Sequence, residues 1–188
     1  MSLWIILAII VALVLFVIFS YNGTVKHYNA VRRAWANVNN YERQKVKILE
    51  SLEPQIAQYS DYEKGLQTRI TELRSSIDAL DSADPQATNL QQVEAQTREV
   101  MQGLSVTMEN YPDLKANTVF LNLMEEITSQ NENVGAAISI FNRDVEQFNA
   151  RIKMFPHNLV NASLNHKRHV DEFSDSTAEE NIEYQPSF

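Results

Sequence analysis

A heptad repeat in the second half of this 188-residue chain constrains its fold more than any other feature. One heptad position carries only apolar residues: Phe120, Ile127, Val134, Phe141, Phe148 and Phe155. The second position carries Met124, Asn131, Ile138, Val145 and Ile152. Two apolar positions in a heptad form a stripe along a helix that packs against a partner helix. We therefore expect a long helix that starts between residues 114 and 117, with Phe120, Phe141, Phe148 and Phe155 in the core of a bundle.

The amino-terminal end holds an uninterrupted apolar run from Leu3 to Phe19. At about 1.5 Å per residue, this run is near the lower limit for crossing a hydrocarbon core of ~30 Å. Trp4 would lie at the interface, with Phe16 inside the span. A cleaved signal peptide is the alternative, but no basic residue precedes the run and no small-x-small pattern follows it. We expect residues 1–21 to be an uncleaved transmembrane anchor.

Basic residues crowd the segment that follows this anchor. Six of them oppose the single acidic Glu42, and they are Lys26, Arg32, Arg33, Arg43, Lys45 and Lys47. The positive-inside rule then places the body in the cytoplasm and the amino terminus outside. A periplasmic body is the alternative, because folded domains can be translocated whatever their charge.

The anchor helix is expected to continue into the body. Tyr21, Tyr28 and Trp35 recur every seven residues, which predicts a helix with Trp35 in the core. Pro54 is expected to kink or end this helix near Glu53.

Two amphipathic segments follow, over residues 59–80 and 90–108, and turn residues at 81–85 separate them. A signature turn comes next, made of Tyr111, Pro112, Asp113, Leu114 and Lys115, in which Asp113 is placed to cap the next helix. Helices joined by short turns pack alternately up and down. The predicted fold is all-α: an N-terminal transmembrane helix that continues into an up-down bundle of about four long helices over residues 22–155.

The carboxy-terminal part divides into two segments of different character. Residues 156–173 combine an apolar side with a basic flank, which predicts a short amphipathic segment at the membrane interface. Lys153, Lys167 and Arg168 are the expected contacts with lipid headgroups, and an ordinary extension of the bundle is the alternative. Residues 174–188 contain acidic residues and no Lys or Arg, so we expect a largely disordered tail.

Asparagines repeat at heptad spacing on two of the expected helices. Asn22 and Asn29 do so on the first, and Asn142 and Asn149 on the last. Because asparagine is a mediocre helix former, such rows suggest packed contacts. These contacts would join helices of one bundle or neighbouring subunits.

The residues that carry chemistry are not arranged as a catalytic site. The chain has no cysteine, which excludes disulfides, thiolate zinc sites and a cysteine nucleophile. It has no glycine-rich phosphate loop, nucleophile elbow or H-E-x-x-H motif. His166, His169 and Glu172 are one turn apart and could hold a metal, but they border the acidic tail and are more simply solvated. We expect no enzyme activity, no catalytic residue, no metal or other cofactor, and no nucleic-acid partner.

Several of these motifs together resemble the LemA family. They are the amino-terminal span, Ala34-Trp35-Ala36, Tyr111 to Ala116, the Phe-Asn repeats, Phe155-Pro156 and the terminal Pro186-Ser187-Phe188. The resemblance implies a single-pass bacterial inner-membrane protein with a bundle of long helices and no established biochemical activity. The chain departs from the family at Leu49 to Leu52, where members usually have Ile-Pro-Asn-Leu. It departs again at Asn131 and Ile138, which replace a glutamate and an arginine.

The functional expectation is a membrane-anchored helical scaffold that self-associates laterally into a higher-order homo-oligomer and shapes or organises the membrane. The alternative is an adaptor that docks another membrane or envelope protein through the bundle or the acidic tail. The expected partners are the lipid bilayer, further copies of the chain and an unidentified membrane protein.

Overall fold

The computed structural model describes residues 2–57, 63–80, 85 and 87–174 of the chain. Within this part, every regular element is helical, which confirms the predicted all-α fold class. The elements in chain order are α1 (Ser2–Ile56), α2 (Glu63–Asp78), α3 (Ala87–Asn110), α4 (Pro112–Lys115), α5 (Thr118–Lys153), α6 (His157–Val160) and the π-helical turn η1 (Asn161–Asn165).

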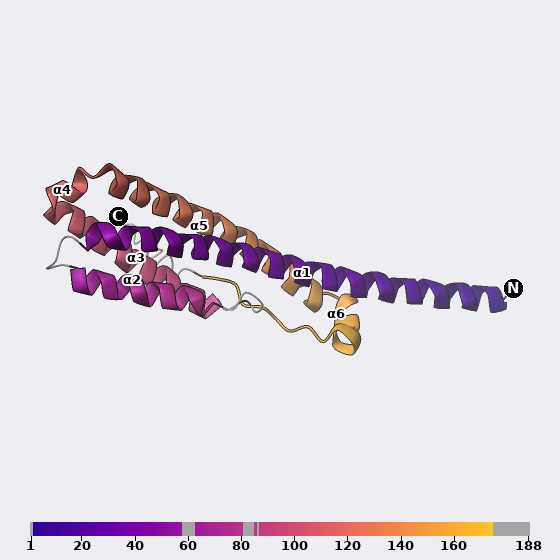
Figure 1. Ribbon diagram of the computed structural model, residues 1–188. Coiled ribbons are helices and arrows are strands. Elements are labelled where there is room, and N and C mark those ends of the chain that lie inside the picture. Colours follow the sequence, from indigo (N-terminus) through magenta and orange to yellow (C-terminus); the bar gives the residue numbers. More distant parts are fainter. Residues whose placement is uncertain (1, 58–62, 81–84, 86, 175–188) are drawn as a thin grey trace, which may run out of the picture.

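Helix α1 is a single unbroken helix of 55 residues. It begins in the apolar run and passes through Gly23 into the body, as expected (Figure 1). Pro54 lies inside its last turn, and the helix ends at Ile56 rather than near Glu53. A proline lacks a backbone N–H and crowds the preceding turn of a helix. Because Pro54 lies so close to the end of α1, few backbone hydrogen bonds are affected.

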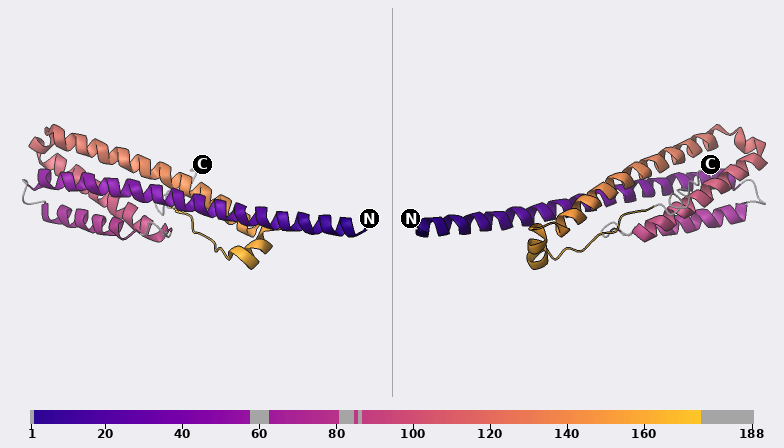
Figure 2. Two further views of the ribbon diagram at one scale, coloured as in Figure 1. Left: turned by 45° about the vertical axis from the view of Figure 1, so that its right-hand side comes forward. Right: turned by 180° about the vertical axis from the view of Figure 1, so that it is seen from behind.

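The helices run alternately away from the anchor and back towards it. Helix α5 packs antiparallel along α1, and the α2–α3 hairpin covers another side of α1 at the end far from the anchor (Figures 1 and 2). The short α4 makes the distal connection between α3 and α5. The return of α5 therefore brings its carboxyl end to the point where α1 leaves the bundle.

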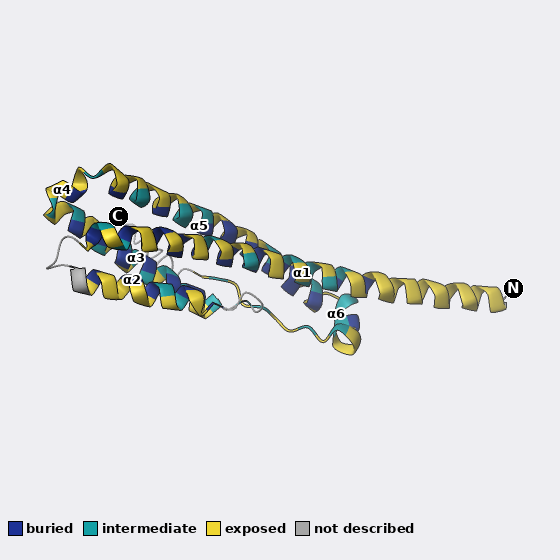
Figure 3. Cartoon of the chain, in the orientation of Figure 1, coloured by how far each residue is buried: buried dark blue, intermediate teal, exposed yellow. Residues whose placement is uncertain are grey.

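Aromatic pairs join α1 to α5 in the core. Trp35 packs against Phe141 with ring centroids 5.4 Å apart, and Tyr28 packs against Phe148 at 5.5 Å. Both pairs are tilted, which is a favoured geometry for aromatic rings. The side chains of Trp35, Phe120, Phe141 and Phe148 are completely buried. Figure 3 shows the buried residues of α1 and α5 on the sides that face each other.

Phe155 does not belong to this core, contrary to expectation, because it is 76% exposed. Helix α5 ends at Lys153, two residues before the last phenylalanine of the repeat. A heptad position predicts a direction only while the chain remains helical. Beyond the helix end the backbone turns through the cis peptide bond of Phe155–Pro156, and the ring points to the surface.

The signature turn forms α4, which buries Leu114 and leaves Asp113 and Lys115 exposed. The expectation that Asp113 caps the following helix is wrong. Asn117 is the cap of α5, and its side-chain oxygen accepts hydrogen bonds from the backbone N–H groups of Val119 (3.0 Å) and Phe120 (3.3 Å). Asp113 instead lies in the first turn of α4, where a carboxylate suits the helix dipole.

The amino-terminal part of α1 projects beyond the bundle. The large apolar side chains from Leu3 to Phe19 are all exposed, with Trp4 at 73% and Phe19 at 71% (Figure 3). Among the described residues, α1 is a helix long and apolar enough to cross a membrane. An exposed apolar surface of this size on a projecting helix is what lipid would cover.

Candidate functional site

The chain just beyond α5 meets α1 at the carboxy-terminal end of the apolar run. The ring of His157 stacks on Phe16 with centroids 6.0 Å apart, and its Nδ1 lies 2.7 Å from Ser20 Oγ. Ser20 and Thr24 are buried here, and the Thr24 hydroxyl donates to the Ser20 carbonyl at 3.1 Å. A small polar cluster, made of Ser20, Thr24 and His157, thus lies on one face of α1 where the apolar span ends.

Gly23 allows the side chain of Arg151 on α5 to approach α1 beside this cluster. A Cβ added at Gly23 would collide with the guanidinium group of Arg151. The missing side chain lets Arg151 lie across α1, whereas α1 itself remains helical at this point. Gly23 is therefore a packing position and not a break in the helix.

Beyond α5 the chain forms a compact projection, which we call the foot and define as residues 154–165. It includes α6 and η1, and it lies beside α1 below the bundle (Figure 1). Four large apolar side chains of the foot are exposed: Met154 (60%), Phe155 (76%), Leu159 (59%) and Leu164 (52%). Val160 of α6 is buried, and α6 packs against both α1 and α5.

From the foot, the chain turns back along the bundle as an extended segment, which we call the strap and define as residues 166–174. The turn is at His166, whose φ of 51° lies in the left-handed region. The strap then runs from the foot towards the α2–α3 end of the bundle (Figures 1 and 2). At its far end, Gln91 of α3 donates to the Ser174 carbonyl at 2.7 Å.

Three asparagines hold the strap by its backbone. Each side-chain amide donates to the carbonyl and accepts from the N–H of one strap residue. Asn161 binds Lys167 (3.0 and 3.1 Å), Asn149 binds Val170 (2.8 and 3.1 Å), and Asn142 binds Phe173 (2.7 and 2.9 Å). The gripped residues recur every third position, and the three amides satisfy backbone groups that an extended segment would otherwise leave unpaired.

The asparagine rows therefore have different environments on the two helices. Asn142 and Asn149 of α5 bind the strap of their own chain. Asn22 and Asn29 of α1 are exposed. Seven residues of a helix advance about as far as three extended residues. The heptad spacing of Asn142 and Asn149 on α5 therefore matches the three-residue spacing of Val170 and Phe173 in the strap.

The three expected headgroup contacts are also in different environments. Lys153, the last residue of α5, and Arg168, in the strap, are both exposed. Lys167 is half-buried, and its ammonium lies 3.9 Å from the centroid of the Tyr28 ring. This cation–π contact, with the Asn161 clamp, ties the start of the strap to α1.

A buried charged cluster joins α1 to α3 in the distal half of the bundle. The Lys45 ammonium donates to Glu42 Oε1 at 3.2 Å and to Thr97 Oγ1 at 3.2 Å, and it lies 3.9 Å from Glu94. Glu42 and Lys45 are completely buried. Burial raises the pKa of Glu42 to about 7, although the Lys45 charge opposes this shift.

Sequence reasoning missed this cluster, although the signal was present. Glu42 and Lys45 occupy positions at which the apolar stripe of α1 should continue between Val38 and Leu49. Charged residues at such seam positions are costly to bury unless they find partners. The partners come from α3, and nothing in the local pattern of α1 identifies them. The cluster therefore links α1 to α3 through buried charged and polar groups.

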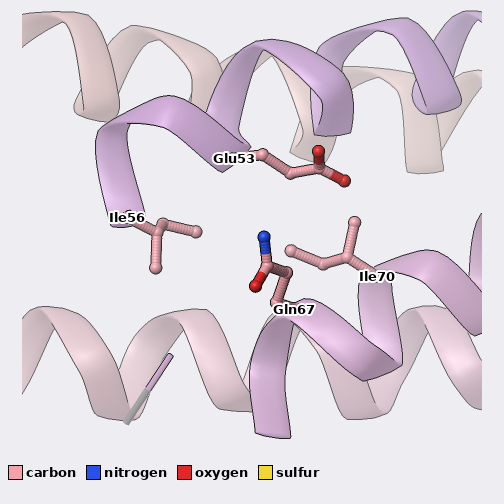
Figure 4. Close-up of a pocket in the computed structure, with 4 residues that line it drawn as sticks. All are labelled: Glu53, Ile56, Gln67 and Ile70. Carbon is pink, nitrogen blue, oxygen red and sulfur yellow. The ribbon is translucent and has the colours of Figure 1, made fainter. Parts of the chain in front are cut away.

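Hollows of very different size lie between the helices: one of about 370 Å³ lies between α2 and α3, and one of about 250 Å³ between α1 and α5. The space between the end of α1 and α2, shown in Figure 4, is lined by Glu53, Ile56, Gln67 and Ile70 and measures about 10 Å³. That is enough for one water molecule. Nearby, Arg74 binds Glu50 at 2.6 Å and Glu53 at 3.0 Å, which closes this end of the bundle. Within the described ranges, no three His, Asp or Glu residues are close enough to hold a metal ion.

The acidic tail, which was considered as a docking segment, lies outside the described residues from 175 onward. The candidate surfaces of the described part are the projecting span, the foot, the clamped strap and the exposed sides of α1 and α5.

The model of the LemA family matches residues 34–185. Protein LemA of Metamycoplasma hominis is 26% identical over 143 residues, which are 76% of this chain and 64% of that relative's length. The chain thus spans somewhat less than two thirds of this curated relative. On the match that covers most of its length, this chain belongs to the LemA family.

Proposed function

We propose that this protein is a membrane-anchored helical scaffold whose copies associate side by side in the plane of the bilayer. The observation that carries the proposal is a surface over α1 and α5 that is rich in small and amide side chains, where Asn37, Ala136 and Ile140 are exposed and Ala34 and Ala137 are buried. A shallow cleft marks its centre and is lined by Ala34, Asn37, Tyr41, Asn133, Ala136, Ala137 and Ile140. Small residues allow the backbones of neighbouring helices to approach closely, and amides can then bond across the contact.

This face extends along α1 towards the membrane. Asn22, Asn29 and Asn40 are all exposed, and their spacing puts them in one row on α1. The row adjoins the cleft because Asn37 lies less than a quarter turn away from it. Ile140, 44% exposed, supplies an apolar centre for the contact. A polar surface with a small apolar centre suits an association that forms only where the protein is concentrated.

Membrane anchoring supplies that concentration. A shared bilayer holds every copy at one height and in one orientation, which raises the effective concentration of matching faces. Because α1 continues without interruption from the span into the body, the orientation of the span is passed to the cleft. Repeated side-by-side contact of this kind would give rings or curved arrays that organise the membrane.

The proposed location is the bacterial inner membrane, with the body in the cytoplasm. The basic residues Lys26, Arg32, Arg33, Arg43 and Lys47 are exposed along α1 just beyond the span and support this orientation. Because the chain has no cysteine, Arg43→Cys gives a single labelling site in intact cells. We expect a membrane-impermeant maleimide to label it only after the inner membrane is opened. Labelling with the inner membrane intact would place the body in the periplasm.

The central experiment compares two matched substitutions in the full chain. Ala136→Glu puts a charge into the cleft, and Ala95→Glu puts the same charge on an exposed position of α3. In detergent or in nanodiscs, mass photometry and cross-linking should show a higher-order oligomer for the parent and for Ala95→Glu. Ala136→Glu should shift the distribution to smaller species. A parent protein that remains monomeric at every concentration would overturn the proposal.

A further inference from the structure

The foot exposes apolar side chains at the depth where α1 enters its apolar span. Phe155, Leu159 and Leu164 are each more than half exposed. His157, between the first two, contacts Phe16 and Ser20 of α1. Because Phe16 belongs to the segment that lipid would surround, a side chain at the level of His157 meets lipid headgroups before it meets water.

We propose that the foot is a second membrane contact, inserted into the headgroup layer of the bilayer that α1 crosses. The partner is the lipid surface itself, favoured when anionic. This inference rests on the membrane anchoring in the proposed function but not on self-association. It differs from a simple anchor in that two separate parts of the chain bind one bilayer.

The charges around the foot suit an anionic surface. Lys153 precedes the apolar residues, and His166, Arg168 and His169 follow them, all exposed. Acidic groups face this cluster from the strap: Asp171 lies 3.9 Å from His169, and Glu172 follows. Of the exposed Lys and Arg residues, Lys153 and Arg168 lie nearest the apolar residues in sequence. An apolar surface flanked by basic residues is the usual composition of a segment that lies in the interface.

The position of the foot is fixed from three sides. Its start is attached through His157 and Ser20, its end through the Asn161 clamp on Lys167, and the strap beyond it through Asn149 and Asn142. A foot braced in this way cannot change its depth without moving the bundle. Its insertion therefore sets the tilt of the body relative to the membrane, in addition to the direction set by α1.

Two single-cysteine variants of the full chain test this inference. Leu159→Cys places a label in the foot, and Val119→Cys places one on a comparably exposed apolar position at the distal end of α5. Each is labelled with an environment-sensitive fluorophore and reconstituted into vesicles that contain spin-labelled lipids. We expect several-fold stronger quenching by shallow spin labels at Leu159→Cys than at Val119→Cys. Aqueous iodide should show the opposite preference.

Equal and weak quenching by lipid at both sites would overturn the inference. A label at Leu159→Cys that neither lipid nor iodide reaches would also overturn it and would indicate cover by protein. Self-association is measured separately, by Ala136→Glu against Ala95→Glu, so each idea can fail alone. Repeating the measurement in zwitterionic and phosphatidylglycerol-containing vesicles tests the charge. We expect stronger quenching in the vesicles that contain the anionic lipid. Equal quenching in the two kinds of vesicle would contradict a preference for anionic lipid.

Discussion

At the scale of the residue, the asparagines of α5 show how one side chain can supply the hydrogen bonds that a neighbouring strand would otherwise provide. An asparagine amide presents a donor and an acceptor with the spacing of a backbone peptide group, so it pairs with both groups of one extended residue. Asn149 is 4% exposed, and its two bonds to the half-buried Val170 are partly shielded from water. The net contribution of such a hydrogen bond to stability is small. Removing one partner costs more, because it leaves the other partner buried and unpaired.

We expect Asn149→Ala to release the middle of the strap. The loss leaves the Val170 N–H and carbonyl unpaired beside the core, at a cost of about 1–3 kcal/mol. Hydrogen exchange should become faster across residues 167–173 while α1 and α5 remain protected. Asn29→Ala, at an exposed position of α1, is the control and should leave exchange in the strap unchanged. Unchanged protection in Asn149→Ala would show that the apolar contacts of Val170 and Phe173 suffice.

A second prediction at this scale concerns the pH dependence of stability. The pKa of Glu42 rises from 4.5 to about 7 on folding, mainly through burial. The native state therefore binds more protons than the unfolded state between these values, and stability falls as pH rises from about 4.5 to 7. Glu42→Gln should flatten this part of the curve in chemical denaturation.

Glu99→Gln is the matched control for the pH experiment, because Glu99 is exposed on α3. It should retain the pH dependence of the parent. If Glu42→Gln and the parent lose stability in parallel from pH 4.5 to 7, the buried cluster does not control this dependence.

At the scale of the element, α1 and α5 show that glycines in helices have different roles. A Cβ on Gly135 would have nothing within 4 Å, whereas one on Gly23 would meet Arg151. Glycine in a helix interior costs about 0.5–1 kcal/mol relative to alanine. At Gly135 no packing reason offsets that cost, but at Gly23 the close approach of Arg151 does.

We therefore expect Gly135→Ala to raise the free energy of unfolding by about 0.5–1 kcal/mol. Gly23→Ala should gain less, because the Arg151 guanidinium must move away from α1 to make room. Thermal or denaturant unfolding of the two variants in the same detergent measures the difference. A gain at Gly23 equal to that at Gly135 would mean that the position of Arg151 contributes nothing to stability.

The heptad pattern predicted the elements more reliably than their ends. The long helix of the second half and the continuation of the anchor helix both follow from residues spaced along one helix. The errors occur at termini, where Phe155 leaves the core and Asn117 rather than Asp113 caps α5. Ends are decided by which side chain reaches a free backbone group, and several nearby residues can compete for that role.

At the scale of the whole molecule, the span is mechanically joined to the body but is not part of its core. No residue from Leu3 to Phe19 is buried, and the first buried side chain of α1 is Ser20. The bundle should therefore fold without the span, although copies released from the membrane lose their shared plane and orientation.

A chain that begins at Ser20 tests this separation. We expect it to keep a cooperative, helical unfolding transition, because it retains the buried contacts between α1 and α5. Circular dichroism and sedimentation velocity should show a folded protein that is less associated than the full chain at equal concentration. Loss of cooperative unfolding would mean that the span contributes to the fold, and unchanged association would mean that the membrane does not promote it.

The amino-acid sequence by itself determined the all-α class, the long amphipathic helices, the exposed span and the family, because these depend on residue type and on spacing within one helix. Only the tertiary structure decided that Asn142 and Asn149 grip the strap, that Glu42 and Lys45 find Thr97 and Glu94, and that Phe155 is exposed in a braced foot. The physical reason is that each of these depends on groups far apart in the chain. Helical periodicity specifies which face a residue occupies, but only packing specifies what lies opposite that face.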